Sequence, residues 1–219
     1  MRKDREKIRT ITIKKIIDME VQNTGAASTQ CAAGAPYDSL RFCQGQRVIP
    51  GIKNKSYYIA KRDIVKWPTL PDPSATGTTL KTAAVYAGDF TLAADKKWKS
   101  IDLALNKGNL EWETQGEHPS CTVLNKVTLS YPGTTAEAAA FCGMAMNDDL
   151  VYLVQQRDGQ YRVLGNDMFN TVTKPKGSTG EGASTNGGTD LEIEVTDLYP
   201  APFYSGKIET DDGTINETM

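Results

Sequence analysis

VYLVQQRDGQYRVLGN, residues 151–166, decides the fold because it predicts a β-hairpin whose strands are apolar on both faces. Val151 and Leu153 point to one side of the first strand, and Tyr152 and Val154 point to the other. The Asp-Gly pair between the strands predicts a two-residue type I′ turn. An antiparallel hairpin usually keeps one face in water, so the second face of this one needs a cover. We expect the sheet core to cover one face, and either the preceding helix or a neighbouring chain to cover the other.

The segment before the hairpin, TTAEAAAFCGMAMN at residues 134–147, predicts the helix of the fold. Thr134 and Glu137 fit a T-x-x-E capping box, and alanine dominates the interior. The helix is short, so we expect it to lie against a sheet. The residues predicted to make this contact are Ala140, Phe141, Met144 and Ala145.

The rest of the chain predicts strands separated by long loops, about nine or ten strands in all. NLEWETQGE, at residues 109–117, alternates Leu, Trp and Thr with Glu, Glu and Gln, which is typical of a half-buried strand. We therefore predict a mainly β fold, an antiparallel β-sandwich or barrel with one flanking α-helix and long loops. Residues 1–219 are expected to form a single domain, with a basic arm at 1–20 and a Gly/Ser-rich loop at 170–189.

Charge is distributed unevenly along a chain whose formal net charge is only -2. Residues 1–17 hold seven Lys or Arg against two acids, whereas residues 181–219 hold nine acids against a single lysine. A basic arm is common in proteins that contact nucleic acid or a membrane, and oppositely charged ends also suit subunits that meet head to tail. Two solvated ends with no special role remain the alternative interpretation.

The sequence offers few residues for catalysis. The single histidine, His118, is three residues from Cys121, but this spacing across a proline does not indicate a nucleophile pair. Glu111 and Glu113 share a strand face, about 7 Å apart by strand geometry, and we interpret them as the wet side of a strand. The glycine-rich stretch GSTGEGASTNGG, at 177–188, lacks the lysine of a phosphate-binding loop. We predict no enzymatic activity, no cofactor and no metal site.

The apolar cluster at 11–17 is interrupted by Lys14 and Lys15, so it predicts neither a secretory signal nor a transmembrane span. The four cysteines are widely spaced and lack a C-x-x-C pair, so we expect free thiols in a reducing compartment. Together these features favour a protein made and kept in the cytoplasm of the producing cell.

The order of elements resembles that of the tail tube (major tail) proteins of long-tailed bacteriophages, which are similar in fold to type VI secretion tube subunits. The resemblance depends on GIKNKSYYIAKRDIVKWP at 51–68, the helix at 134–147, the hairpin at 151–166, and the glycine-rich loop before DLEIEVTDLYPAPFYSG at 190–206. The segment at 23–50, which holds Cys31 and Cys43, has no counterpart in this pattern.

The resemblance implies a virion structural protein that assembles in the host cytoplasm into hexameric rings. In such a family the sheets of a ring join into an inner β-barrel, and the rings stack into a tube for DNA ejection. Its partners would be other copies of itself, other tail proteins, and DNA that passes without specific binding, with no membrane involved.

The same resemblance assigns two sets of residues. The subunit-contact candidates are Arg2, Lys3, Arg5, Lys14, Lys15, Lys174, Lys176, Gly180 and Gly182. The lumen-facing candidates are Glu111, Glu113, Glu192 and Glu194. An acidic lumen would repel phosphate and keep DNA from adhering. A phage head or capsid auxiliary (decoration) protein is the alternative, because it would share the composition and the long loops.

Overall fold

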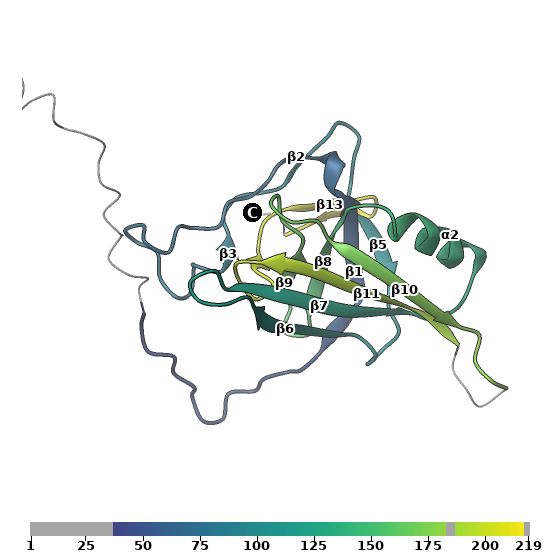
Figure 1. The fold of residues 1–219 in the computed structure, drawn as a ribbon, viewed down its shortest axis with the longest axis horizontal. Helices are drawn as coiled ribbons and strands as arrows, with labels where there is room; N and C mark the ends of the chain where they lie inside the picture. Colours follow the sequence, from purple (N-terminus) through teal and green to yellow (C-terminus); the bar gives the residue numbers. More distant parts are fainter. Residues whose placement is uncertain (1–36, 183–186, 217–219) are drawn as a thin grey trace, which may run out of the picture.

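The computed structural model describes residues 37–182 and 187–216, and shows two β-sheets stacked face to face with one α-helix at their side (Figure 1). The prediction of a mainly β fold with a single α-helix is confirmed for the described residues. The predicted basic arm at 1–20 lies outside them, and the prediction of a single domain over 1–219 stays a prediction.

The larger sheet has six strands in the order β3-β12-β9-β8-β1-β5, and every pair in it is antiparallel except β3 and β12, which are parallel. Its strands are β1 (Ile52–Ala60), β3 (Val85–Tyr86), β5 (Lys99–Asp102), β8 (Leu150–Gln156), β9 (Tyr161–Leu164) and β12 (Phe203–Tyr204). The four-stranded sheet is antiparallel throughout, in the order β10-β11-β7-β6. Its strands are β6 (Asn109–Gln115), β7 (Thr122–Tyr131), β10 (Val172–Ser178) and β11 (Gly188–Asp197).

Two small sheets and a single 3₁₀ turn complete the described structure. Their bounds are η1 (Lys61–Asp63), β2 (Ile64–Lys66) with β4 (Thr91–Leu92), and β13 (Ile208–Thr210) with β14 (Gly213–Ile215). The described residues thus hold more strands than predicted, because strands of two or three residues are too short to show a period in the sequence.

The main core lies between the two large sheets. Tyr152 and Leu164 of the predicted hairpin, now β8 and β9, are fully buried there. They pack in one cluster with Leu129 of β7 and Ile193 of β11, which are also fully buried. Alternate residues of all four strands therefore face inward, as the pattern of β7 and β11 predicts.

The second face of the hairpin is covered by the same chain. Val151, Leu153 and Val163 have no solvent exposure and belong to a second apolar cluster outside the six-stranded sheet. The side chains that cover them come from two segments of the same chain, at 64–98 and 204–215: Ile64, Tyr86, Phe90, Trp98, Tyr204 and Ile208. The expectation that the helix or a neighbouring chain covers this face was wrong.

The turn of the hairpin also differs from the prediction. Gly159 has a φ of 98°, whereas Asp158 is not in the left-handed region that a type I′ turn requires of both residues. The backbone N–H of Gly159 donates to the carbonyl oxygen of Gln156 at 3.0 Å, and that of Gln156 donates to the carbonyl oxygen of Gln160 at 2.8 Å. The loop is therefore the three-residue form, in which a glycine closes a bulge.

The α-helix, α2 (Ala136–Ala145), lies beside β10 at one side of the sandwich and not over the hairpin (Figure 1). Its N-cap is Thr135, whose side chain accepts a hydrogen bond from the N–H of Ala138, so the predicted capping box of Thr134 and Glu137 was displaced by one residue. Ala140 and Met144 were wrongly predicted to contact the sheet, because Ala140 is exposed and Met144 is 67% exposed. The helix face that meets the core is Ala138, Phe141, Cys142 and Ala145.

The predicted loop at 170–189 is mostly sheet. Residues 172–178 form β10 and residues 188–197 form β11, so the connection is limited to residues 179–187. The residues of β10 that face the core include Thr173, whose hydroxyl is 2.9 Å from the buried hydroxyl of Tyr152. A strand whose inner face carries threonine, proline and glycine has no apolar period, which explains the wrong prediction.

The cap of α2 gives a paired test. We expect Thr135→Ala to lower the free energy of unfolding by about 1 kcal/mol, because the N–H of Ala138 loses its side-chain acceptor. Thr134→Ala should change it by less than about 0.5 kcal/mol, as is usual for a surface substitution away from a cap. Urea unfolding of both variants measures the difference, and equal effects would contradict this cap.

Alkaline pH should weaken the second cluster. Burial raises the pKa of Tyr161 and of Tyr204 to about 12, from an ordinary value of 10.0. The folded chain holds these two protons more tightly than the unfolded chain, so the resulting stability is present below pH 10 and is lost as the pH rises through about 12. Urea unfolding across this interval should show the decline. A parallel series on Tyr161→Phe should show a smaller one, and a flat profile in the parent chain would contradict the assignment.

Candidate functional site

The concavities found in the described structure are open to solvent. One of about 610 Å³ lies at the end of the four-stranded sheet and is lined by Lys107, Tyr131, Lys176 and Asp190 together with glycines. No group of three His, Cys, Asp or Glu side chains suited to a metal ion occurs among the described residues. Within the same residues, no helix has the length and apolar character needed to cross a membrane.

His118 and Cys121 both lie exposed in the turn that joins β6 to β7. The sulfur of Cys121 is 4.0 Å from the carbonyl oxygen of Gly116, so the thiol is directed at the backbone of its own turn. Cys43, Cys121 and Cys142 are free thiols.

The outer face of the four-stranded sheet gathers the charged residues that the sequence singled out. We call it the charged face, and its ionisable side chains are Glu111, Glu113, Lys126, Lys174, Lys176, Asp190, Glu192 and Glu194. The four lumen-facing candidates therefore share one exposed surface, although they come from β6 and β11, which are not neighbours. Lys174 and Lys176 lie on the same face, in β10, and not in a loop.

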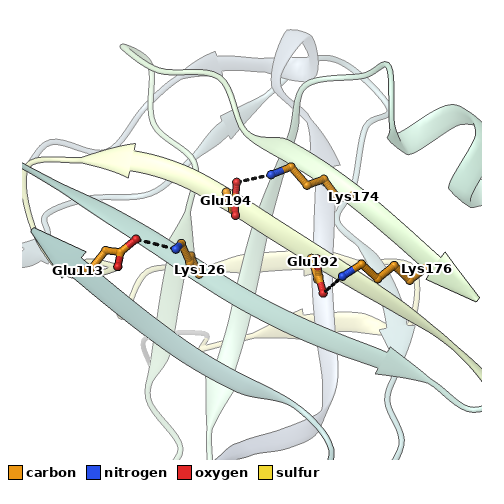
Figure 2. Close-up of polar contacts among 6 residues, drawn as sticks. All are labelled: Glu113, Lys126, Lys174, Lys176, Glu192 and Glu194. Carbon is orange, nitrogen blue, oxygen red and sulfur yellow. Dashed lines mark hydrogen bonds and ion pairs between the residues drawn. The ribbon is translucent and has the colours of Figure 1, made fainter. Parts of the chain in front are cut away.

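Three ion pairs cross this face between neighbouring strands (Figure 2). The Nζ of Lys126 lies 2.6 Å from Oε1 of Glu113, and this hydrogen bond raises the pKa of the lysine. The Nζ of Lys174 lies 2.6 Å from Oε2 of Glu194. The Nζ of Lys176 lies 2.5 Å from Oε1 of Glu192. All three pairs are partly exposed to water, so they define the pattern of charge more than they stabilise the sheet.

The sign of the charge alternates from strand to strand. β6 and β11 contribute acids, whereas β7 and β10 contribute lysines. Three of the four lumen-facing candidates are thereby neutralised by a lysine, and the charged face carries five acids against three lysines. The charged face therefore has a small excess of acids.

The remaining subunit-contact candidates are separated from this face. Gly180 and Gly182 follow the end of β10, at a distance from the body of the sandwich (Figure 1), and both have a positive φ, 79° and 76°. Arg2, Lys3, Arg5, Lys14 and Lys15 lie outside the described residues.

The two edges of the four-stranded sheet are unequal. β10 carries Pro175, which has no N–H to donate, and α2 packs beside it. Both features are typical of an edge that is protected from further strands. β6 has β7 as its neighbour on one side and an open edge on the other, and five of its seven residues are exposed. Its backbone is therefore able to pair with another strand.

A buried arginine lies next to Trp112 of β6. Arg162 of β9 is 6% exposed, and its guanidinium lies 3.8 Å from the ring centroid of Phe203 and 5.6 Å from that of Trp112. Its Nη1 donates to the carbonyl oxygen of Pro200 at 3.4 Å, whereas its buried Nε has no partner. Burial lowers the pKa of this side chain. Arg162 is not apparent from the sequence as a special residue, because its one signal is a lone charge within an apolar strand.

Comparisons of the chain with protein-family models, with curated proteins and with solved structures found no match. The charged face and the open edge of β6 are therefore the features from which a function can be inferred.

The buried charge of Arg162 is testable by two substitutions. Arg162→Met keeps an unbranched side chain between the two rings, so the free energy of unfolding should stay within about 1 kcal/mol of the parent value. Arg162→Ala should lower it by about 2–3 kcal/mol, because it opens a gap beside Trp112 and Phe203. Denaturant unfolding distinguishes them, and equal losses would show that the charge itself stabilises the fold.

Proposed function

We propose that this chain is a virion structural protein that assembles into stacked hexameric rings, and that these rings form the tail tube through which a long-tailed phage ejects DNA. The observation that carries the proposal is the open, seven-residue edge of β6 beside an exposed, charged sheet face. An exposed edge strand is a ready site for association with another chain.

The charged face has the character that the wall of a DNA channel needs. Its excess of acids over lysines repels phosphate weakly, and its lysines are already engaged by carboxylates. No aromatic side chain lies on the outward positions of its four described strands, so it offers no platform on which bases could stack. DNA would pass such a surface without being held.

Ring formation requires that β6 of one copy meets a different surface of the next copy. Two β6 edges that paired with each other would give a closed twofold dimer and no ring. A heterologous contact, in which another segment of the next copy meets β6, repeats from copy to copy and closes into a ring when the rotation allows. The tail proteins that cap such a tube would be its further partners.

The full chain at rising concentration gives the direct test. Mass photometry and negative-stain microscopy should show rings or tubes with a central channel. Single molecules at every concentration would contradict the proposal, and binding only to assembled capsids would replace it with the decoration protein.

A variant of the open edge sharpens this experiment. Thr114 is an exposed, core-side residue of β6, and Thr114→Lys places an inward-pointing charge on the edge, which natural sheets use to prevent pairing. We expect this variant to remain monomeric with an unchanged thermal unfolding temperature. Val65→Lys, at a 69% exposed position of β2, is the matched control and should assemble as the parent does.

A further inference from the structure

An extended segment precedes β1 and exposes an unusual number of large apolar side chains. Residues 37–49 are all exposed, and those with large apolar side chains are Tyr37, Leu40, Phe42, Val48 and Ile49, which are 54% to 92% exposed. The hydrogen bonds that the structure describes for these residues stay within the segment. Figure 1 shows the segment running outside the two sheets. A run of exposed apolar residues marks an interaction site.

The middle of this segment has the pattern of a half-buried strand. Leu40 and Phe42 alternate with Ser39, Arg41 and Cys43, which are small or polar. A turn follows directly, closed by the N–H of Gln46 donating to the carbonyl oxygen of Cys43 at 3.1 Å. The segment thus offers five residues in which one strand face is apolar and the other carries a positive charge.

The open edge of β6 offers the complementary pattern. Leu110 and Trp112 point toward the core side of the sheet, and Trp112 is still 51% exposed there. Glu111 and Glu113 point to the charged face. Glu113 is paired with Lys126, whereas Glu111 is hydrogen-bonded to the side-chain amide of Asn109 and has no lysine or arginine at ion-pair distance among the described residues.

We propose that residues Ser39–Cys43 of one copy add as a further strand to the open edge of β6 in a second copy of this chain. Leu40 and Phe42 then cover Leu110 and Trp112, and Arg41 meets Glu111 on the charged face. This inference rests on the proposed function in so far as both need copies to associate through β6. It names the strand that makes the contact.

The position of the segment favours a second copy over the same one. The segment leads into β1 at Ile52, whose side chain packs against Gly108, immediately before β6. Its own β6 edge is therefore within reach of the nine residues that lie between Phe42 and Ile52. The segment nevertheless lies away from that edge with its apolar residues in water. An exchange between copies buries both surfaces and gives the heterologous contact that a ring requires.

A charge exchange tests the predicted pair of Arg41 and Glu111. Arg41→Glu and Glu111→Arg should each raise the concentration at which half of the chains assemble by about tenfold, because each places two like charges side by side. The two substitutions combined in one chain should return this concentration to within about threefold of the parent value. Arg47→Glu makes the same charge change beyond the turn and should have no effect.

Disulfide cross-linking decides between a second copy and the same copy. In a background without the four natural cysteines, Arg41→Cys chains and tagged Glu111→Cys chains are mixed under mild oxidation. A cross-linked pair of one tagged and one untagged chain is the expected result. A cross-link that forms only when both substitutions are in one chain would overturn the inference in favour of intramolecular pairing, and no cross-link in either case would overturn it altogether.

Failure of this inference is distinguishable from failure of the proposed function. Rings or tubes that form normally with no recovery in the charge exchange would overturn the inference and leave the proposed function in place. Chains that stay monomeric at every concentration would overturn both.

Discussion

The fold depends on keeping the β8–β9 hairpin dry on both faces. Nine residues are buried, 150–154 of β8 and 161–164 of β9. Their side chains point alternately to opposite faces, so one covering layer cannot bury all of them. The four-stranded sheet covers the face that carries Tyr152. The chain excursions that carry Phe90, Trp98 and Ile208 cover the other. These two segments form the two small sheets, β2 with β4 and β13 with β14, whose strands have only two or three residues.

Because the hairpin is covered by its own chain, it gives no reason for self-association. A hairpin with an uncovered face would need a second chain, but Val151 and Leu153 are sealed by their own chain. The surfaces that remain incompletely covered lie elsewhere, at the core side of β6 and along residues 37–49. Association would therefore involve the edge of β6 and the segment at 37–49, both of which lie at the margin of the fold and outside its core.

What the sequence predicted well was set by local periodicity. β6, β7 and β11 alternate cleanly, so their faces follow from the sequence, including the shared side of Glu111 and Glu113. β10 escaped prediction because its inner face relies on Thr173, which contributes a hydrogen bond and little apolar surface. The cap at Thr135 escaped because Glu137 lies three residues after Thr134 and favoured that threonine, whereas the backbone places the N-cap at Thr135. The covering of the hairpin and the stacking of Arg162 depend on contacts between distant segments, which no local pattern encodes.

The charged face and the open edge are connected through the alternation of charge. Each lysine strand of the sheet lies beside an acidic strand, so every interior column of charge has a neighbour of opposite sign. The alternation ends at the acidic strand β6. There Glu113 is paired with Lys126 of β7, whereas Glu111 has no ion-pair partner among the described residues. A strand added at this edge would continue the alternation only if it carried a basic residue between two apolar ones. The sequence Leu40-Arg41-Phe42 has this order, and it stands in an exposed segment whose described hydrogen bonds stay within the segment.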